Sequence, residues 1–378
     1  MTLIADLDLI SLEYSIAPEL AYGTARGLNN KRSSTIVKLT TDDGITGYGE
    51  ASGPIAPIRE YLAILKGFFI GKRLYDFELI ATYIRDRLDH FGEGHNISCL
   101  SGINVAAFDA MGKKLGVPVH DLLGGRSAEN IPCYATTGYI TRDGMAGLER
   151  QLAAVDKSQF RGVKIKIGIN PKSDVERVRL ARKMLGDDLL LMVDVNGNYT
   201  PDVALLSARA IEPYDIHWIE EPLRTSDIAG HAELRARSPI PIATGEGYHG
   251  VHEFKTLVEA RGVDILQPAL GKCGGLSTLR AVALLAETAN LRIVPAVWGG
   301  AFVVAAAMHF MASLASSPHT ENPPYPRMLE FDIGDNPLRD RLLKKPLTPK
   351  NGSVALPSGP GLGIEVDFDA IKPYVARA

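Results

Sequence analysis

The feature that most constrains the fold is a regular alternation of strand and helix patterns that begins at Pro132. Short segments rich in apolar and β-branched residues alternate with amphipathic segments such as "DVERVRLARKMLG" and "LSTLRAVALLAETAN". Strands separated by crossover helices form parallel sheets, and eight of them close into a barrel. The eight predicted strands are "CYATTGYI", "GVKIKIG", "LLLMVDVN", "IHWIEEP", "PIATGE", "VDILQPAL", "LRIVPAVW" and "RMLEFD".

The regions on either side of this alternation have other patterns. The segment "SSTIVKLTTDDGITGYGEA" (33–51) predicts a hairpin around an Asp-Gly turn, and two segments of helical periodicity follow it. The last segment, "NGSVALPSGPGLGIEVDFDAIKPY", has Gly/Pro turns and lacks the barrel period. We therefore expect an α+β region before the barrel and a tail that returns to that region.

Composition excludes several functional classes. A net charge of −3, without a Lys/Arg run, argues against a nucleic-acid or membrane-surface partner. The three cysteines lack metal spacing and indicate buried thiols in a reducing compartment. The first residues do not have the pattern of a signal peptide, and the most apolar stretch (301–315) is too short to cross a bilayer. A soluble, cytoplasmic protein is expected.

One predicted strand, "RGVKIKIG" (161–168), places Lys164 and Lys166 on the same face, because strand side chains alternate. At the ends of the following strands stand Asp194 with Asn196, then Glu220 with Glu221, and then Glu246. The carboxyl ends of barrel strands meet at one mouth, which is where barrel enzymes hold their active sites. The acids Asp194, Glu220 and Glu246 follow at intervals of 28, 26 and 26 residues, so each comes from the next strand.

Three neighbouring carboxylates cannot all stay ionised without a cation. Oxygen ligands without nearby His or Cys favour Mg²⁺ over zinc. Two adjacent ammonium groups should lower the pKa of one of them, which lets a neutral amine act as a base near neutral pH.

The motifs "VKIKIG", "VDVNGNY", "WIEEPL" and "ATGEG", in this order and spacing, resemble the enolase superfamily in its mandelate racemase and muconate lactonizing enzyme branch. The resemblance covers nearly the whole chain. It implies an α+β capping domain (1–128), a modified (β/α)7β barrel (129–345) and a tail (346–378) that completes the capping domain. It also implies a homo-oligomer, either a dimer or an octamer.

The resemblance further implies one Mg²⁺ ion held by Asp194, Glu220 and Glu246, which binds a small-molecule carboxylate and stabilises its enediolate. Lys166 would be the base that removes the α-proton, and Lys164 would tune it and touch the carboxylate. Glu330 would hydrogen-bond that carboxylate from the side opposite the metal. The other candidate substrate-binding residues are Asn196, His249, Tyr139, Trp298 and Arg26, the last of them facing a second substrate carboxylate.

The chain departs from the family pattern at two positions. Ala269 and Ala296 stand where the sixth and seventh strands of the racemases carry an Asp/His dyad, the second acid/base. Chemistry on one face remains, with Lys166 removing the α-proton and then assisting departure of a β-oxygen. The expected reaction is a β-elimination, either cycloisomerisation of an aldaric lactone or dehydration of a sugar acid.

Three alternatives remain open at this point. An epimerase or racemase could use another acid, for which Lys272, three residues beyond Ala269, is one candidate. A family member that has lost catalytic activity could bind a ligand without turnover. An enzyme in which Ala269 and Ala296 had been introduced by mutagenesis to trap the substrate would have the same sequence pattern.

Overall fold

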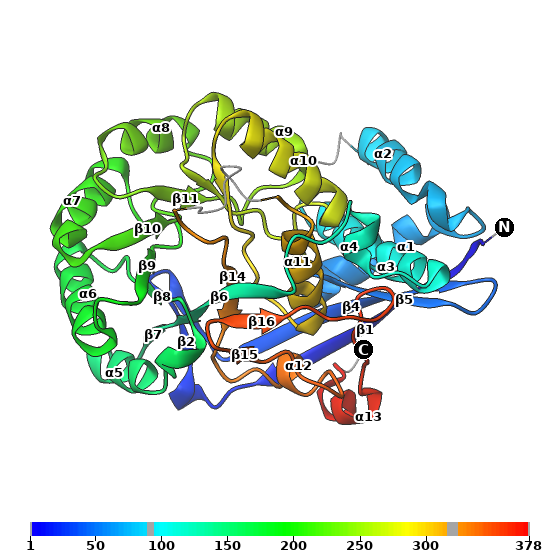
Figure 1. Ribbon diagram of the computed structural model, residues 1–378, viewed down its shortest axis with the longest axis horizontal. Coiled ribbons are helices and arrows are strands. Elements are labelled where there is room, and N and C mark those ends of the chain that lie inside the picture. The colour runs from blue at the N-terminus through cyan, green and yellow to red at the C-terminus, as the bar shows by residue number, and fades with distance from the viewer. Residues whose placement is uncertain (1, 89–93, 316–323, 377–378) are drawn as a thin grey trace.

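The barrel is built from eight parallel strands, as predicted. The computed structural model describes residues 2–88, 94–315 and 324–376. Successive strands pair from β13 back to β6, and β14 pairs with β6 from its other side. Figure 1 shows these strands at the centre of the larger part of the molecule. They are β6 (Asn130–Thr137), β8 (Gly162–Lys166), β9 (Leu190–Asp194), β10 (Ile216–Glu220), β11 (Ile242–Thr244), β12 (Ile265–Leu266), β13 (Arg292–Ile293) and β14 (Leu329–Asp332).

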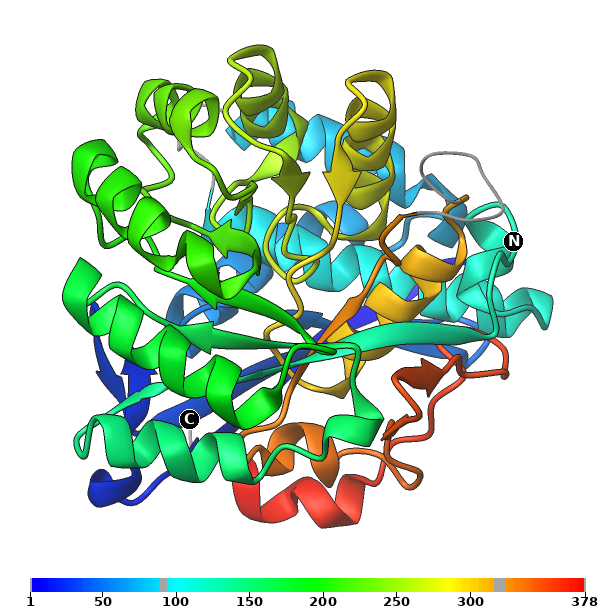
Figure 2. The ribbon, with the colours of Figure 1, turned by 60° about the vertical axis from the view of Figure 1, so that its left-hand side comes forward.

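One helix follows each of the first seven strands and covers the barrel from outside, which gives the (β/α)7β order. Figure 2 shows the green-to-yellow helices ranged around the strands. Buried Val and Ile residues on the outward face of the strands, among them Val163, Ile165 and Val193, pack against these helices in one core cluster. The helices are α5 (Met145–Ala153), α6 (Pro171–Leu185), α7 (Pro201–Ile211), α8 (Ile228–Arg237), α9 (Gly250–Glu259), α10 (Gly275–Thr288) and α11 (Ala301–Ala312).

The N-terminal part is an antiparallel sheet packed on helices. Strand β4 (Lys31–Thr41) lies between β1 (Ile4–Ser15) and β5 (Thr46–Ala51), and the predicted hairpin turns at 42–45. Helices α1 (Ile55–Phe69), α2 (Phe77–Leu88) and α3 (His95–Leu115) follow, and then the short α4 (Val119–Leu122). Ile58, Phe69, Ile84 and Leu100 belong to a second core cluster between this sheet and its helices.

Two small elements connect the N-terminal part and the tail to the barrel. The hairpin of β2 (Tyr22–Thr24) and β3 (Gly27–Asn29) pairs with β7 (Ile140–Thr141), which follows the first barrel strand. In the tail, β15 (Pro349–Lys350) and β16 (Ser353–Ala355) extend the sheet from β6, while α12 (Pro337–Asp340) precedes them and α13 (Phe368–Ile371) follows. The Ala376 amide donates to the Ser11 carbonyl at 2.8 Å, so the tail contacts both parts. The domain limits at 128 and 345 remain predictions.

Over the ranges that the structure describes, the helices lack the combined length and apolarity that a membrane crossing requires.

Candidate active site

The charged residues singled out in the sequence meet at the carboxyl ends of neighbouring barrel strands. Lys166, Asp194 and Glu220 are the last residues of β8, β9 and β10, and Glu246 follows β11 by two residues. In the parallel register Asp194 pairs with Lys166 on one side and with Glu220 on the other. Parallel pairing without offset therefore places these three side chains next to one another at the mouth of the barrel.

Both lysines form buried ion pairs with these acids. Lys166 Nζ lies 2.5 Å from Asp194 Oδ2. Lys164 Nζ contacts Glu220 Oε1 and lies 2.9 Å from Glu330 Oε1 and 3.9 Å from Asp194 Oδ2. The Lys164 and Glu220 side chains are each 1% exposed, so these charges interact in a low effective dielectric.

The expectation of a lowered lysine pKa is wrong in its net direction. Burial and, as expected, the Lys164 ammonium lower the pKa of Lys166, but Asp194, Glu246 and Glu220 together raise it above its ordinary value. Burial acts in the same direction on the pKa of Lys164, and Glu220 and Glu330 raise that pKa well above normal. The lysines therefore stay protonated while they are paired with these carboxylates.

Acids outnumber cations at the mouth. Burial, and then the charges of Glu246 and Asp194, raise the pKa of Glu221. Glu221 therefore joins Asp194, Glu220, Glu246 and Glu330 in one cluster. Three ammonium groups oppose these five carboxyl groups, since Lys272 lies 3.9 Å from Glu246. With all of them ionised the cluster has a charge of −2, which a single divalent cation neutralises.

The residues fit a hard divalent cation by donor type and charge. Their oxygens are the ligands that Mg²⁺ prefers, and the buried Asn196 Oδ1 beside Asp194 has no hydrogen-bond partner among the described residues. No three His, Cys, Asp or Glu side chains of the described ranges form a preassembled metal cluster. The ammonium groups of Lys164 and Lys166 lie against the Glu220 and Asp194 oxygens instead.

Two of these carboxylates are oriented by further hydrogen bonds. Glu220 Oε2 accepts from Gln267 Nε2 at 2.8 Å and from Trp218 Nε1 at 3.3 Å. Glu330 Oε1 accepts from Thr136 Oγ1 at 2.7 Å, and its Oε2 accepts from the Val297 amide at 2.8 Å. These donors leave each carboxylate little freedom to rotate.

Backbone strain also gathers here. Asn196 and Glu221 both have positive φ, 51° and 40°, which non-glycine residues rarely adopt. Such strain costs on the order of 1–3 kcal/mol and concentrates at functional sites.

A cavity of about 390 Å³ opens above this cluster, between the barrel and the N-terminal part. Lys166, Glu246, Lys272 and Glu330 line it from the barrel. Two segments of the N-terminal part contribute Tyr22 to Thr24, Asn29 and Glu50 to Gly53. The wall of the cavity that faces the barrel residues therefore comes largely from the N-terminal part.

Several polar atoms on this wall lack partners. Four buried side-chain atoms without a hydrogen bond in the described residues belong to lining residues: Arg32 Nε, Glu50 Oε2, Asn196 Oδ1 and Asn336 Oδ1. Buried polar groups are nearly always paired, so such a cluster calls for an explanation. One donor and three oxygens suit a ligand that carries both hydroxyl and carbonyl or carboxylate oxygens.

The candidate substrate-binding residues divide into two groups. Tyr139, Trp298, Asn196 and Glu330 line the cavity. Arg26 is exposed, and neither it nor His249 belongs to the cavity wall. His249 Nδ1 lies 3.9 Å from Glu253, and burial lowers the pKa of the imidazole.

Sequence reasoning missed Arg32 and Asp332, which also lie at this end of the barrel. Asp332 is two residues beyond Glu330 on β14, so the strand period could have shown that both share a face. Arg32 comes from β4 of the N-terminal part, and no local pattern relates it to the barrel.

The two alanines lie across the barrel from Lys166. Ala269 and Ala296 form a parallel bridge just beyond β12 and β13, and both are buried. In the strand order, β12 is four positions from β8, which is the opposite side of an eight-stranded barrel. These positions contribute only methyl groups on the side that faces Lys166.

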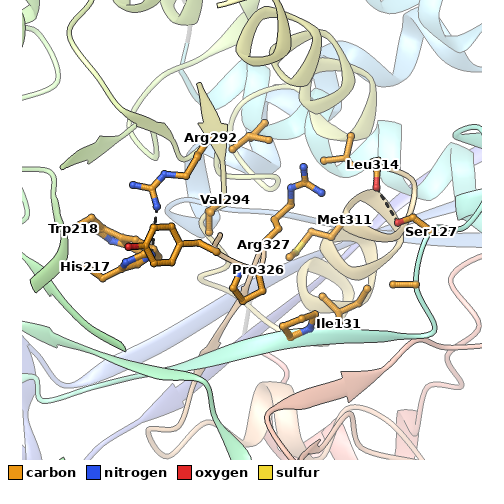
Figure 3. A pocket seen from close by; sticks show the side chains of 14 residues that line it. Ser127, Ile131, His217, Trp218, Arg292, Val294, Met311, Leu314, Pro326 and Arg327 are labelled. Carbon is orange, nitrogen blue, oxygen red and sulfur yellow. Dashed lines mark hydrogen bonds between the residues drawn. The ribbon is translucent and has the colours of Figure 1, made fainter. Parts of the chain in front are cut away.

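A second cavity, of about 220 Å³, lies at the other end of the barrel (Figure 3). Its wall includes Ile131, His217 and Arg292, which stand at the amino ends of their strands. Arg292 Nη1 lies 3.4 Å from His217 Nε2. This cavity is remote from the lysines and acids, because those residues lie at the carboxyl ends of the strands, where barrel enzymes hold their active sites.

A barrel of (β/α)7β order with an α+β cap and Lys-x-Lys, Asp, Glu and Glu at successive strand ends defines a class of enzymes that enolise carboxylates. Residues 147–370 match the family described as enolase C-terminal domain-like, and residues 15–124 match the mandelate racemase / muconate lactonizing enzyme N-terminal domain. The chain belongs to the enolase superfamily, in this mandelate racemase and muconate lactonizing enzyme branch.

Curated relatives and a solved structure narrow the reaction class. D-galactarolactone cycloisomerase of Agrobacterium fabrum is 37% identical over 91% of this chain and 92% of its own length. Arabinonate dehydratase of Saccharolobus solfataricus is 30% identical over 93% and 96% of the two chains. A racemase from Streptomyces coelicolor A3(2), solved with bound magnesium, superposes with a TM-score of 0.87 at 28% identity and covers 99% and 100% of the two chains. The protein is therefore an enzyme of the isomerase or lyase type that acts on a small molecule.

Proposed function

We propose that the protein enolises a sugar acid or its lactone and then eliminates a β-oxygen, with Lys166 as the base. The observation that carries this proposal is the asymmetry of the mouth. Lys166 lines the cavity on one side, and Ala269 and Ala296 place no titratable group on the other. Proton transfer on both faces of one carbon would have to recruit Lys272, which lines the cavity but lies 3.9 Å from Glu246, whereas elimination on one face needs only Lys166.

Asp194, Glu220 and Glu246 are the residues proposed to hold one Mg²⁺ ion. When bound, the ion would supply the positive charge that holds the substrate carboxylate, stabilises the negative charge that develops on it, and relieves Lys166 of its pairing with Asp194. The steps that follow are assigned to side chains of this chain.

Lys164 and Glu330 position the substrate carboxylate. Lys164 is buried and donates to Glu330, which is itself held by Thr136 and the Val297 amide. A carboxylate at this place meets the Lys164 ammonium, which the ionised Glu330 holds in position. Burial raises the pKa of Glu330, but Lys164, Thr136 and the Val297 amide lower it to about 2. The contact with Lys164 strengthens as the α-carbon loses its proton and charge moves onto the carboxylate oxygens.

Lys166 takes the α-proton as a neutral amine, and the C–H electron pair enters the enediolate. That pair then forms the C=C bond while the β-carbon–oxygen bond breaks, and the oxygen leaves as a lactone carboxylate or, after protonation by the Lys166 ammonium, as water. The enol product becomes a keto-deoxy acid. A positioned general acid is typically worth 10²–10⁴-fold, so the lactone is the better substrate of the two.

The unpaired atoms of the wall support a polyhydroxylated acid as the substrate. The oxygens of Glu50, Asn196 and Asn336 can accept from sugar hydroxyl groups. The relatives named as a cycloisomerase of a sugar-acid lactone and as a sugar-acid dehydratase support the same substrate class.

The test is α-proton exchange in D₂O with Mg²⁺ and a panel of aldaric lactones, aldonates and simple hydroxy acids, followed by NMR. We expect turnover or deuterium wash-in with wild type and loss of both in Lys166→Ala. Lys172→Ala, which removes an exposed lysine of α6, is the matched control and should match wild type. Exchange with inversion would instead indicate an epimerase with a second acid, and absence of exchange with every carboxylate would indicate a ligand-binding member.

A further inference from the structure

Arg32 is a buried arginine on the wall that the N-terminal part contributes to the cavity. It lies on β4, lines the cavity and is only 8% exposed. Its guanidinium carbon is 4.8 Å from the ring centre of Tyr22 and 5.0 Å from that of Trp298. Two aromatic faces therefore hold the guanidinium plane in one orientation.

The charged partner of Arg32 is Asp332, whose own contacts are fully used. Arg32 Nη1 lies 2.9 Å from Asp332 Oδ2, and Tyr139 donates its hydroxyl to Asp332 Oδ1 at 2.7 Å. Arg339, which also pairs with the half-exposed Asp340, reaches Asp332 Oδ2 at 3.4 Å. Because Asp332 is shared between two guanidinium groups, it does not cancel the charge of Arg32 completely.

One donor of Arg32 remains unused. Its Nε is buried and has no hydrogen-bond partner among the described residues. A buried donor left unpaired costs on the order of 1–3 kcal/mol, more when it carries charge. Arg32 lines the cavity and keeps this unpaired donor just beneath the wall, so an acceptor on the ligand can pair with it once the wall adjusts.

The distance from the reacting end fits a six-carbon diacid. Asp332 follows Glu330 by two residues on the same strand, a rise of about 6.6 Å. The carboxyl carbons of an extended six-carbon diacid are roughly 6 Å apart, because each C–C bond of about 1.5 Å advances a zigzag chain by about 1.25 Å. A substrate whose first carboxylate lies at Glu330 and Lys164 thus brings its far end to the level of Arg32.

We infer that Arg32 determines specificity by binding the far end of the substrate, and that this end is a second carboxyl group, free or closed into a lactone. This inference rests on the proposed function, since it places the reacting carboxylate at Lys164 and Glu330. It assigns the enzyme to aldaric acids and their lactones rather than to aldonic acids, whose far end is a primary alcohol.

The experiment compares D-galactarate with D-galactonate, two acids that differ only at the far carbon, as competitive inhibitors or substrates of the Mg²⁺-loaded enzyme. Wild type should bind galactarate more tightly. Arg32→Met, which keeps the stacking between Tyr22 and Trp298, should weaken galactarate binding about 10- to 100-fold and change galactonate binding less than about threefold, the range for a charged hydrogen bond. Arg26→Met, which changes an exposed arginine between β2 and β3 that does not line the cavity, should behave as wild type.

Arg32→Lys keeps a charge without the planar fork and should lose part of the preference, several-fold, while remaining folded by circular dichroism. If Arg32→Met does not fold, the comparison of galactarate and galactonate binding is made with Arg32→Lys alone. Equal weakening of both ligands in either variant, or equal binding of both by wild type, overturns the inference. If wild type lacks α-proton exchange with every acid, the proposed function fails; if exchange persists without a preference that depends on Arg32, only this inference fails.

Discussion

Lys164 is the residue on which the charge balance of the site depends most. Its ammonium contacts Glu220 and lies 2.9 Å from Glu330, and all three side chains are nearly inaccessible. A buried pair is costly to break, because removing one partner leaves the other charged and unsolvated. Lys164 therefore serves the stability of the barrel mouth as well as the proposed chemistry.

Lys164→Met is expected to destabilise the metal-free protein by about 3–5 kcal/mol, since it leaves Glu220 and Glu330 without that ammonium. Urea unfolding followed by circular dichroism measures this change. Lys272→Met is the control, because Lys272 is about one-third exposed and 3.9 Å from Glu246, and it should cost less than about 1 kcal/mol. Equal effects of the two variants would show that burial of the Lys164 pair is not what matters.

Individual residues also show where sequence reasoning ends. The strand period predicted that Lys164 and Lys166 share a face, and the strand ends predicted that Asp194 and Glu220 meet there. The direction of the lysine pKa shift was wrong, because it depends on carboxylates that three other strands bring within contact. Local periodicity predicts which face of a strand a side chain lies on, but it does not predict which residues of other strands that side chain contacts.

At the scale of elements, α3 packs very closely on β5 in the N-terminal part. The helix presents Gly102, Ala106 and Ala110, four residues apart and so on one face, to the glycines of β5. A Cβ atom on Gly49 would lie 2.1 Å from the Gly102 carbonyl oxygen, and one on Gly47 would lie 2.0 Å from that of Ala106. Glycine is needed there for space, because β5 and α3 touch backbone to backbone.

Gly49→Ala is therefore expected to push β5 away from α3 and to cost about 1–3 kcal/mol of stability, the usual range for overpacking. Gly67→Ala is the matched control. Gly67 is an exposed position of α1 with open space around its Cα, so alanine there should stabilise the helix by about 0.5–1 kcal/mol. A Gly49→Ala protein as stable as wild type in thermal unfolding would contradict the close approach.

The order of strands and helices could be predicted from the sequence, but the residues that form the cavity wall could not. Eight strand patterns and the amphipathic segments between them predicted the (β/α)7β barrel, and all eight strands are present. The substrate wall depends on which segment of the N-terminal part reaches the mouth. The exposed Arg26 was the prediction and the buried Arg32 lines the cavity, a difference of six residues set by contact of β4 with the barrel.

At the scale of the whole molecule, stability and metal binding are coupled through the acid cluster. Burial raises the pKa of Glu220, and it also raises the pKa of Glu221, next to Glu246 and Asp194. A carboxyl group whose pKa is higher in the folded state stabilises the fold while it is protonated, and that contribution is lost as the pH rises through the folded-state pKa. The metal-free protein should therefore lose stability as the pH rises from 4.5, the ordinary pKa of a glutamate, through about 8, the folded-state pKa of Glu220.

Added Mg²⁺ should offset this loss, because a cation that binds only the folded state stabilises it by RT ln(1 + [Mg²⁺]/Kd). Protons compete with the cation for Glu220, so the rise in Tm on adding Mg²⁺ should be larger at pH 9 than at pH 6.5. At one hundred times Kd the stabilisation amounts to about 2.7 kcal/mol. Differential scanning fluorimetry with and without EDTA measures it, and Glu220→Gln, which removes a proposed ligand and its titration, should flatten both the pH trend and the Mg²⁺ effect. A Tm that is independent of Mg²⁺ at both pH values would contradict a cation site at Asp194, Glu220 and Glu246.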